Sequence, residues 1–170
     1  CIRDRVYGAL CVALSFMLSY IKLFSLPMGG SLTLCSMLPI AAYACAFGPL
    51  YGFTAGLAFG VLQLIQDFYV IHWAQLLLDY FFAFACYGIA AYFPNKLTLG
   101  IAVAGLCRML CSTLSGGIFF ADSAVDAGWS NAWLYSLAYN GSTIGAETVL
   151  CVLVSLLPPV KKVLGLMKSE

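Results

Sequence analysis

Three ionisable side chains lie inside long apolar stretches of this 170-residue chain: Asp79, Arg108 and Glu147. If those stretches cross a bilayer, a charge at its centre costs at least about 2.5 to 3.5 kcal/mol, so each charge needs a partner or a wet cavity. Two carboxylates and one guanidinium leave one negative charge over. An unpaired carboxylate suits a cationic ligand, whereas an arginine–carboxylate pair that merely locks the helices together is the competing interpretation.

Polar and aromatic side chains recur at helical spacing around these charges, so each of three neighbouring segments carries one polar stripe. Aromatic walls, an amide, a phenol and a carboxylate are what a flat, cationic, hydrogen-bonding ring compound needs. For Asn140 alone, a hydrogen bond between two helices is an equally good explanation. The stripes consist of Asp79 and Tyr80, then Arg108, Ser112, Ser115 and Phe119, then Tyr135, Asn140 and Glu147.

The composition identifies the solvent in which these stripes must be positioned. Hydrophobic residues make up 63% of the chain and charged residues only 9%. A soluble domain carries about 25% charged residues, so this composition cannot build a water-covered surface. It excludes a soluble globular enzyme, a nucleic-acid-binding domain and a disordered chain, and the net charge of +1 gives no attraction to nucleic acid. We therefore predict an integral membrane protein whose solvent is the lipid bilayer.

Proline and glycine divide the chain into six apolar segments, most of them close to the length of about 20 residues that spans a bilayer. The predicted fold class is an all-α integral membrane protein, with six transmembrane helices in one compact bundle and residues 1–170 in a single domain. Pro27 and the Gly29–Gly30 pair are expected to end the first helix, and Pro39 to kink the second. The segments are Val6–Leu26, Leu32–Phe47, Leu50–Gln66, Ala74–Phe93, Leu97–Phe120 and Ala132–Leu157, with an extended polar loop at 121–131.

The distribution of lysine and arginine predicts the orientation, because these residues collect on the cytoplasmic side of membrane proteins. Six of them fall on the side of the two termini and only Lys22 on the other, so both termini are predicted to be cytoplasmic. The tryptophans fall on the outer side, either as an interfacial aromatic belt or as a cover over a ligand. The inner basic residues are Arg3, Arg5, Lys96, Lys161, Lys162 and Lys168, and the tryptophans are Trp73, Trp129 and Trp133.

The sequence lacks the motifs of catalytic and metal sites. Its one histidine, His72, lies in a predicted outer loop, and none of its 8 cysteines forms a C-x-x-C pair. It also lacks a phosphate-binding loop that could hydrolyse a nucleotide. We therefore expect no enzyme activity, metal or cofactor, but a subunit that captures a substrate and takes its drive from a partner. The small side chains of Ala9 and Ala13 form a smooth patch that is a candidate contact with that partner.

Four motifs occur in the order found in one known family, over nearly the whole chain. On these motifs the sequence resembles the thiamine-specific S components of energy-coupling factor (ECF) vitamin transporters. The LLDY and YSLAYNG blocks are specific to the resemblance, whereas the alanine pattern is not. The motifs are GGSLTL-x-S-M-x-P from Gly29 to Pro39, H-x-x-Q-x-LLDY from His72 to Tyr80, R-x-x-x-x-x-x-SG-x-x-FF from Arg108 to Phe120, and WLYSLAYNGS from Trp133 to Ser142, followed by Glu147.

The resemblance implies a multi-pass protein of the bacterial plasma membrane that binds thiamine from outside with high affinity. It also implies partners, namely a transmembrane T component, which would dock at Ala9 and Ala13, and two cytoplasmic ATPases. No nucleic acid is implied, and thiamine would be a transported ligand rather than a cofactor.

Residue roles follow from the same resemblance. In the family, the acidic residue of LLDY and the Tyr and Asn of YSLAYNG bind the aminopyrimidine ring, and an aromatic residue closing the SG-x-x-FF block stacks on the ligand. These roles fall on Asp79, with Tyr80 beside it, on Tyr135 and Asn140, and on Phe120. The remaining predicted ligand contacts are Ser112, Gly116, Arg108, Trp129, Trp133 and Glu147.

The chain departs from the family pattern at two of these positions. Members commonly have a histidine one turn before the SG pair, where this chain has Ser112, and the stacking tryptophan of some members is replaced by Phe120. A thiamine precursor such as hydroxymethylpyrimidine, or another vitamin, therefore stays open as the ligand. A more distant alternative is a proton- or ion-conducting protein or an intramembrane enzyme. The acidic groups disfavour it, because they lie toward one face and not in a relay across the membrane.

Overall fold

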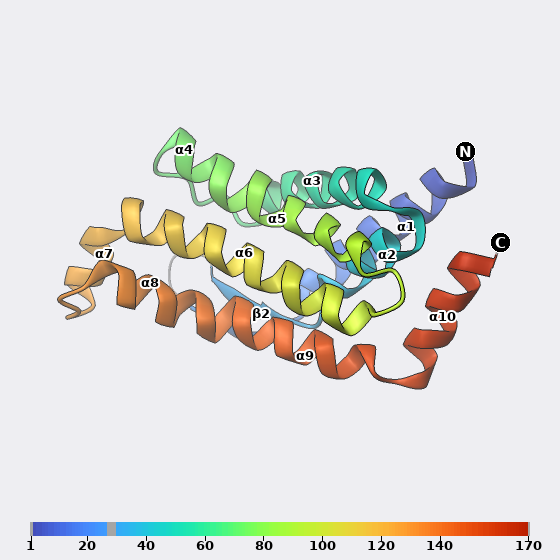
Figure 1. Ribbon diagram of the computed structural model, residues 1–170. Coiled ribbons are helices and arrows are strands. Elements are labelled where there is room, and N and C mark those ends of the chain that lie inside the picture. Colours follow the sequence, from blue (N-terminus) through green and yellow to red (C-terminus); the bar gives the residue numbers. More distant parts are fainter. Residues whose placement is uncertain (1, 27–29, 170) are drawn as a thin grey trace.

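Helices make up most of the structure. The computed structural model describes residues 2–26 and 30–169 and arranges the long helices side by side in one bundle (Figure 1). Both chain ends lie at the same end of this bundle. In chain order the elements are α1 (Ile2–Tyr20), β1 (Lys22–Ser25), β2 (Ser31–Thr33), α2 (Leu38–Phe47), α3 (Pro49–Gln66), α4 (Trp73–Leu76), η2 (Leu77–Phe82), α5 (Ala83–Ala85), η3 (Cys86–Tyr92), α6 (Leu97–Phe119), α7 (Ala121–Asp126), α8 (Ala132–Asn140), η4 (Gly141–Gly145), α9 (Ala146–Ser155) and α10 (Pro158–Ser169).

Three helical runs are long and apolar enough to cross a membrane: Trp73–Tyr92, Leu97–Phe119 and Ala132–Ser155. Each agrees with a predicted span to within two residues at either end. α2 is a shorter apolar helix, and most of its residues are buried inside the bundle. The total of six membrane crossings stays a prediction.

The first predicted helix is too long, and the expectation of an all-α chain is wrong at this point. α1 ends at Tyr20, and the chain then forms an antiparallel pair of strands, in which Lys22 lies opposite Thr33 and Ser25 opposite Ser31. The strands satisfy each other's backbone groups, so this segment needs no helix to do so. Pro27 and Gly29, predicted to end the first helix, lie outside the described residues.

Prolines begin helices here more often than the sequence analysis expected. Pro39 does not kink a long second helix, because α2 begins at Leu38 and Pro39 lies in its first turn, where its missing N–H is not needed. Pro158 in the same way begins α10, a helix that was not predicted. The predicted polar loop at 121–131 is also wrong in part, since it starts with the short helix α7.

Two of the long runs contain a widened, π-helical turn, η2 at Leu77–Phe82 and η4 at Gly141–Gly145. Such turns are rare and frequently occur at functional sites. Asp79 lies within η2, and Asn140 directly precedes η4. The two turns therefore lie on the stripes that the sequence analysis selected.

α3 packs closely on the run that contains η2 and η3. Gly56 and Gly60 lie on the contact face of α3, where an added Cβ would collide with the backbone oxygens of Phe84 and Tyr80, respectively. Small residues at such a contact let two helices approach until their backbones touch. This approach fixes Tyr80, and with it the adjacent Asp79, against the rest of the bundle.

Candidate binding cavity

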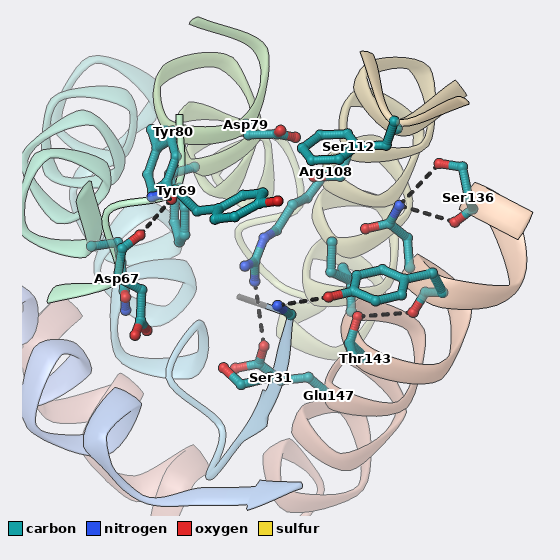
Figure 2. A pocket seen from close by; sticks show the side chains of 18 of the residues that line it. Ser31, Asp67, Tyr69, Asp79, Tyr80, Arg108, Ser112, Ser136, Thr143 and Glu147 are labelled. Atoms are coloured by element: carbon teal, nitrogen blue, oxygen red, sulfur yellow. Dashed lines mark hydrogen bonds and ion pairs between the residues drawn. The ribbon is translucent and has the colours of Figure 1, made fainter. Parts of the chain in front are cut away.

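A cavity of about 170 Å³ lies among the β1–β2 strand pair (the hairpin), the end of α3, η2, α6, α8 and η4. Figure 2 shows side chains from these elements converging on it. Its walls mix polar and aromatic groups with few aliphatic ones. They are Gly30, Ser31, Thr33, Ser36, Gln63, Asp67, Tyr69, Gln75, Asp79, Tyr80, Phe84, Arg108, Ser112, Gly116, Phe120, Tyr135, Ser136, Tyr139, Asn140, Thr143, Ile144 and Glu147.

Most of the predicted ligand contacts line this cavity. They come from three helical runs far apart in sequence, although Ser115 and Phe119 of the predicted α6 stripe do not line the cavity. The role of the lining residues in binding stays a prediction. These residues are Asp79, Tyr80, Arg108, Ser112, Gly116, Phe120, Tyr135, Asn140 and Glu147.

Trp129 and Trp133 do not line the cavity. Their side chains are 43% and 49% exposed. The Trp133 ring covers Gly117 on the outside of α6, and the Trp129 ring meets the edge of Tyr135, with 6.0 Å between the ring centres. This placement favours the aromatic-belt interpretation over a direct ligand contact for Trp133. Trp129 packs against Tyr135, which lines the cavity, without lining the cavity itself.

The carboxylate of Asp79 is held by neutral groups. One of its oxygens accepts hydrogen bonds from the Ser115 hydroxyl at 2.7 Å and from the Gln75 side-chain nitrogen at 3.0 Å. Ser115 and Gln75 are both buried. Within residues 2–26 and 30–169, Asp79 forms no ion pair with a basic side chain. Its negative charge is therefore oriented by neutral donors and has no ion-pair partner among the described residues.

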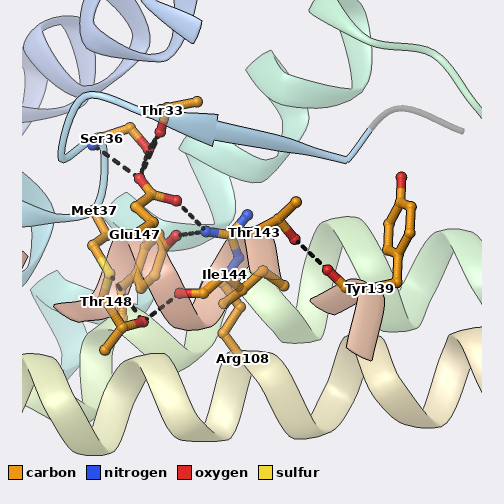
Figure 3. Close-up of polar contacts among 10 residues, drawn as sticks. Thr33, Ser36, Met37, Arg108, Tyr139, Thr143, Ile144, Glu147 and Thr148 are labelled. Atoms are coloured by element: carbon orange, nitrogen blue, oxygen red, sulfur yellow. Dashed lines mark hydrogen bonds and ion pairs between the residues drawn. The ribbon is translucent and has the colours of Figure 1, made fainter. Parts of the chain in front are cut away.

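Glu147 is the opposite case, as Figure 3 shows. One of its oxygens accepts hydrogen bonds from the Thr33 hydroxyl at 2.6 Å and from the hydroxyl and backbone N–H of Ser36 at 2.7 and 3.0 Å. The other oxygen lies 3.3 Å from Nη1 of Arg108. Glu147 is 1% exposed. The competing interpretation, an ion pair that locks the helices, therefore describes Arg108 and Glu147 well.

Arg108 is held from several sides. The same Nη1 donates to the hydroxyl of Tyr87, and the guanidinium lies over the Phe84 ring, 4.5 Å from its centre. Its buried Nε has no hydrogen-bond partner among the described residues. Aromatic faces attract a cation, so Arg108 is stabilised by more than its carboxylate.

Aromatic rings and phenols form much of the remaining wall. The rings of Tyr69 and Phe120 stack with 5.9 Å between their centres and 18° between their planes. The Tyr80 hydroxyl donates to the backbone oxygen of Asp67 at 2.6 Å, and the Tyr139 hydroxyl accepts from the backbone N–H of Gly30 at 2.8 Å. These bonds tie the walls to the loop after α3 and to the hairpin.

Asn140 does not use its amide nitrogen to join two helices. That nitrogen donates to the backbone oxygen of Ser136, one turn earlier on the same helix, at 3.0 Å. No hydrogen bond between described residues uses the amide oxygen of Asn140. The amide of Asn140 is therefore oriented by its own helix at the cavity wall.

Several lining residues were missed by the sequence analysis. Gln63 and Gln75 are amides in apolar helices, and the cost of placing them there was a usable signal. Tyr139 lies within the YSLAYNG block and was passed over because only the first tyrosine was assigned a role. Tyr69 and the hairpin residues gave no usable pattern, because a loop and a short strand lack helical periodicity.

The other predicted features lie away from the cavity. Ala9 and Ala13 are exposed on α1. His72 has a packing role, since its ring accepts a hydrogen bond from the N–H of Ala74 and stacks on Phe119, the last residue of the predicted α6 stripe. Within the described residues, no cluster of histidine, cysteine and acidic side chains could hold a metal ion.

Comparisons with known proteins agree with this arrangement. The profile of the family described as Thiamine transporter protein (Thia_YuaJ) matches residues 5–166. Thiamine transporter ThiT of Bacillus subtilis (strain 168) is 31% identical over 147 residues, with 76% of this chain and 75% of that protein covered. A solved structure of ThiT from Listeria monocytogenes matches with a TM-score of 0.79 at 20% identity, covering 99% of this chain and 95% of that one. At that identity the structural likeness bears on the fold alone.

Proposed function

Because the chain belongs to the thiamine transporter protein family, we propose that it captures thiamine in this cavity as the substrate-binding S component of an ECF-type importer. The family consists of membrane transporters and not of enzymes, and the three membrane-capable helical runs fit a multi-pass membrane protein. High affinity and capture from the outer face are part of the proposal.

The observation that carries the proposal is Asp79, a carboxylate in a polar and aromatic cavity that has no ion-pair partner among the described residues. Thiamine is a cation with an aminopyrimidine ring, whose amino group donates hydrogen bonds that a carboxylate accepts. The thiazolium ring carries the positive charge, which aromatic faces attract. The Tyr69–Phe120 stack lies on the same cavity wall as Asp79 and offers such a face.

We assign the ligand-contacting roles to Asp79, Tyr80, Phe120, Tyr135 and Asn140, with Ser112 and Gly116 beside them on α6. Arg108 and Glu147 reach the cavity as well, but they bind each other. We therefore assign Arg108 and Glu147 to holding their part of the cavity wall in place rather than to contacting the ligand. Trp129 and Trp133 are left out of the ligand contacts, because neither lines the cavity.

Transport requires partners that this chain would dock against. We propose that both termini face the cytoplasm, that a transmembrane T component docks on α1 at Ala9 and Ala13, and that two cytoplasmic ATPases drive the cycle. The exposure of both alanines supports this contact, because a small exposed side chain lets another helix approach closely.

The proposal is tested by titrating thiamine into the purified full-length protein. We expect saturable binding by isothermal titration calorimetry, together with quenching of tryptophan fluorescence, for which Trp129 against Tyr135 is the expected reporter. A Trp129→Phe variant should keep the calorimetric binding and lose much of the quenching. Absence of binding at micromolar thiamine would overturn the proposal.

A precursor is the second candidate, and Ser112 is the observation that favours it. Ser112 lines the cavity at the position where the family commonly has a histidine. If this change removes a contact to the rest of the ligand, hydroxymethylpyrimidine should compete nearly as well as intact thiamine. If thiamine is the ligand, the pyrimidine alone should compete much more weakly. A competition titration with the two compounds separates these outcomes.

A further inference from the structure

A second hollow lies at the end of the bundle that carries the chain termini, away from the thiamine-sized cavity. It is a groove of about 640 Å³ between the start of α6, the end of α9 and α10. Its lining is mostly apolar with two lysines. The lining residues are Asn95, Lys96, Leu97, Thr98, Leu99, Ala102, Val152, Ser155, Leu156, Lys161 and Leu164.

The groove exists because α10 leaves the direction of α9. The chain turns at Pro158, and α10 runs in a different direction from α9 (Figure 1). α10 packs against α2. Two contacts hold α10 there: the buried side chain of Met167 belongs to the central core, and the Lys168 ammonium donates to the backbone oxygen of Pro94. The groove is therefore a fixed part of the fold.

The two kinds of lining residue differ in their chemistry. Leu97, Leu156 and Leu164 give the groove an apolar floor. The hydroxyls of Thr98 and Ser155 are hydrogen-bonded to each other at 3.1 Å, so their polar groups are already satisfied. Lys96 and Lys161 are exposed and lie on two different elements. Within the described residues neither forms an ion pair. The groove thus combines an apolar floor with two unbalanced positive charges.

We propose that this groove binds an anionic phospholipid of the adjoining leaflet, with its phosphate between Lys96 and Lys161 and an acyl chain along the apolar floor. Leu97 and Ser155, which end two membrane-capable helical runs, both line the groove, so we place it at the boundary of the apolar layer, where basic pockets attract anionic headgroups. The outward sides of both helices are apolar, with Leu99 and Leu153 exposed, so an acyl chain has a continuous path to the bilayer. A soluble anion would match the lysines but not the floor.

The proposal is tested with the purified full-length chain in detergent, by native mass spectrometry during titration with phosphatidylglycerol or phosphatidylcholine. We expect phosphatidylglycerol to bind at lower concentration than phosphatidylcholine. Replacing Lys161 by Gln should weaken phosphatidylglycerol binding about fivefold, and Lys96→Gln should add a similar factor, because each lysine near a headgroup contributes separately. Binding of phosphatidylcholine should stay unchanged in both variants.

Lys162 provides a matched control, since it is the next residue on α10, is exposed and does not line the groove. The Lys162→Gln variant has the same charge as Lys161→Gln and should change phosphatidylglycerol binding less than twofold. An Ala102→Phe variant, which fills the floor, should weaken binding of both lipids, and its unfolding temperature shows whether it folds. Equal binding of the two lipids by the natural chain, or equal effects of the Lys161 and Lys162 changes, would overturn the proposal.

Discussion

Two carboxylates face the same cavity, and their surroundings differ in the charge of their partners and in burial, since Glu147 is buried and Asp79 is only partly buried. Asp79 accepts hydrogen bonds from Ser115 and Gln75, which carry no charge. Glu147 accepts a comparable set of hydrogen bonds from Thr33 and Ser36, and in addition it is paired with Arg108. Both carboxylates are oriented, but of the two only Glu147 forms an ion pair among the described residues.

We infer from the charges of their partners that the two carboxylates have different roles. A buried ion whose partner belongs to the protein holds the fold together, and removing one partner leaves the other uncompensated. A carboxylate held by neutral donors gains its counter-charge when a cation enters. The first arrangement predicts a large effect on stability, and the second a large effect on binding.

The largest effect is expected from Glu147→Gln. This change keeps an oxygen for Thr33 and Ser36 but leaves Arg108 charged and buried, so it should lower the free energy of unfolding by about 3 to 5 kcal/mol. Denaturant titration of the protein in detergent measures this difference. The double variant Arg108→Met with Glu147→Gln should recover much of the loss, because it removes the stranded charge. Full stability of Glu147→Gln would contradict the structural role that the comparison gives to Glu147.

The next largest effect is expected from Asp79→Asn, which tests the ligand-binding role of the other carboxylate. It removes the charge that a cationic ligand would balance, so thiamine affinity should fall by about 1 to 3 kcal/mol. Calorimetric titration measures the affinity, and denaturant titration of the same sample should show a much smaller loss than for Glu147→Gln. If Asp79→Asn unfolds the protein while leaving affinity intact, the two carboxylates have been assigned to the wrong roles.

A smaller effect is expected from Ser115→Ala. The hydroxyl of Ser115 donates a hydrogen bond to the Asp79 carboxylate at 2.7 Å. Ser115 itself does not line the cavity. Losing one such bond should weaken thiamine binding by about 0.5 to 1.5 kcal/mol, since Asp79 keeps its bond from Gln75. Ser155→Ala, whose buried hydroxyl donates to the backbone oxygen of Val152 at 2.7 Å and does not line this cavity, provides a control with the same loss of one hydroxyl. Equal effects of the two changes on thiamine affinity would contradict a specific role for Ser115.

The smallest effect is expected from Lys22→Gln, a change to the ion-pair partner of the cavity-lining residue Asp67. Lys22 and Asp67 form an ion pair at 2.7 Å, but both side chains are about a third exposed. Ion pairs in contact with water contribute about 0 to 1 kcal/mol, so unfolding should shift within that range and the shift should shrink with added salt. A loss as large as that of Glu147→Gln would show that exposure does not separate the two ion pairs.

The sequence allowed α6 and its polar stripe to be predicted closely, because one apolar run carries its polar residues at helical spacing. It could not show which carboxylate pairs with Arg108. Asp79 and Glu147 both lie on neighbouring runs, and periodicity does not decide which faces of two helices meet. That choice comes from η4 and the hairpin, which bring Glu147 between Arg108 and Thr33.

The hairpin itself could not be predicted either. Leu23, Phe24 and Leu26 continue the apolar run of α1, and over so few residues an apolar run does not distinguish strand from helix. The two tryptophans excluded from the cavity illustrate another limit. A tryptophan near a helix end looks the same in sequence whether it covers a neighbouring helix, as Trp133 covers Gly117, or packs behind a cavity-lining residue, as Trp129 packs on Tyr135.

The two π-helical turns make helix length itself part of the cavity. Each residue of an α-helix turns the chain by about 100°. Deleting one residue within 77–82 would return that turn to α-helical geometry. The two parts of the helix on either side of the deletion would then rotate relative to each other, and the direction of Asp79 relative to the residues before the turn would change. A deletion within 141–145 would do the same between Asn140 and Glu147. Among relatives, a single-residue gap at either place therefore disrupts the cavity more than the exchange of most side chains, although such a gap would count as a minor difference in an alignment.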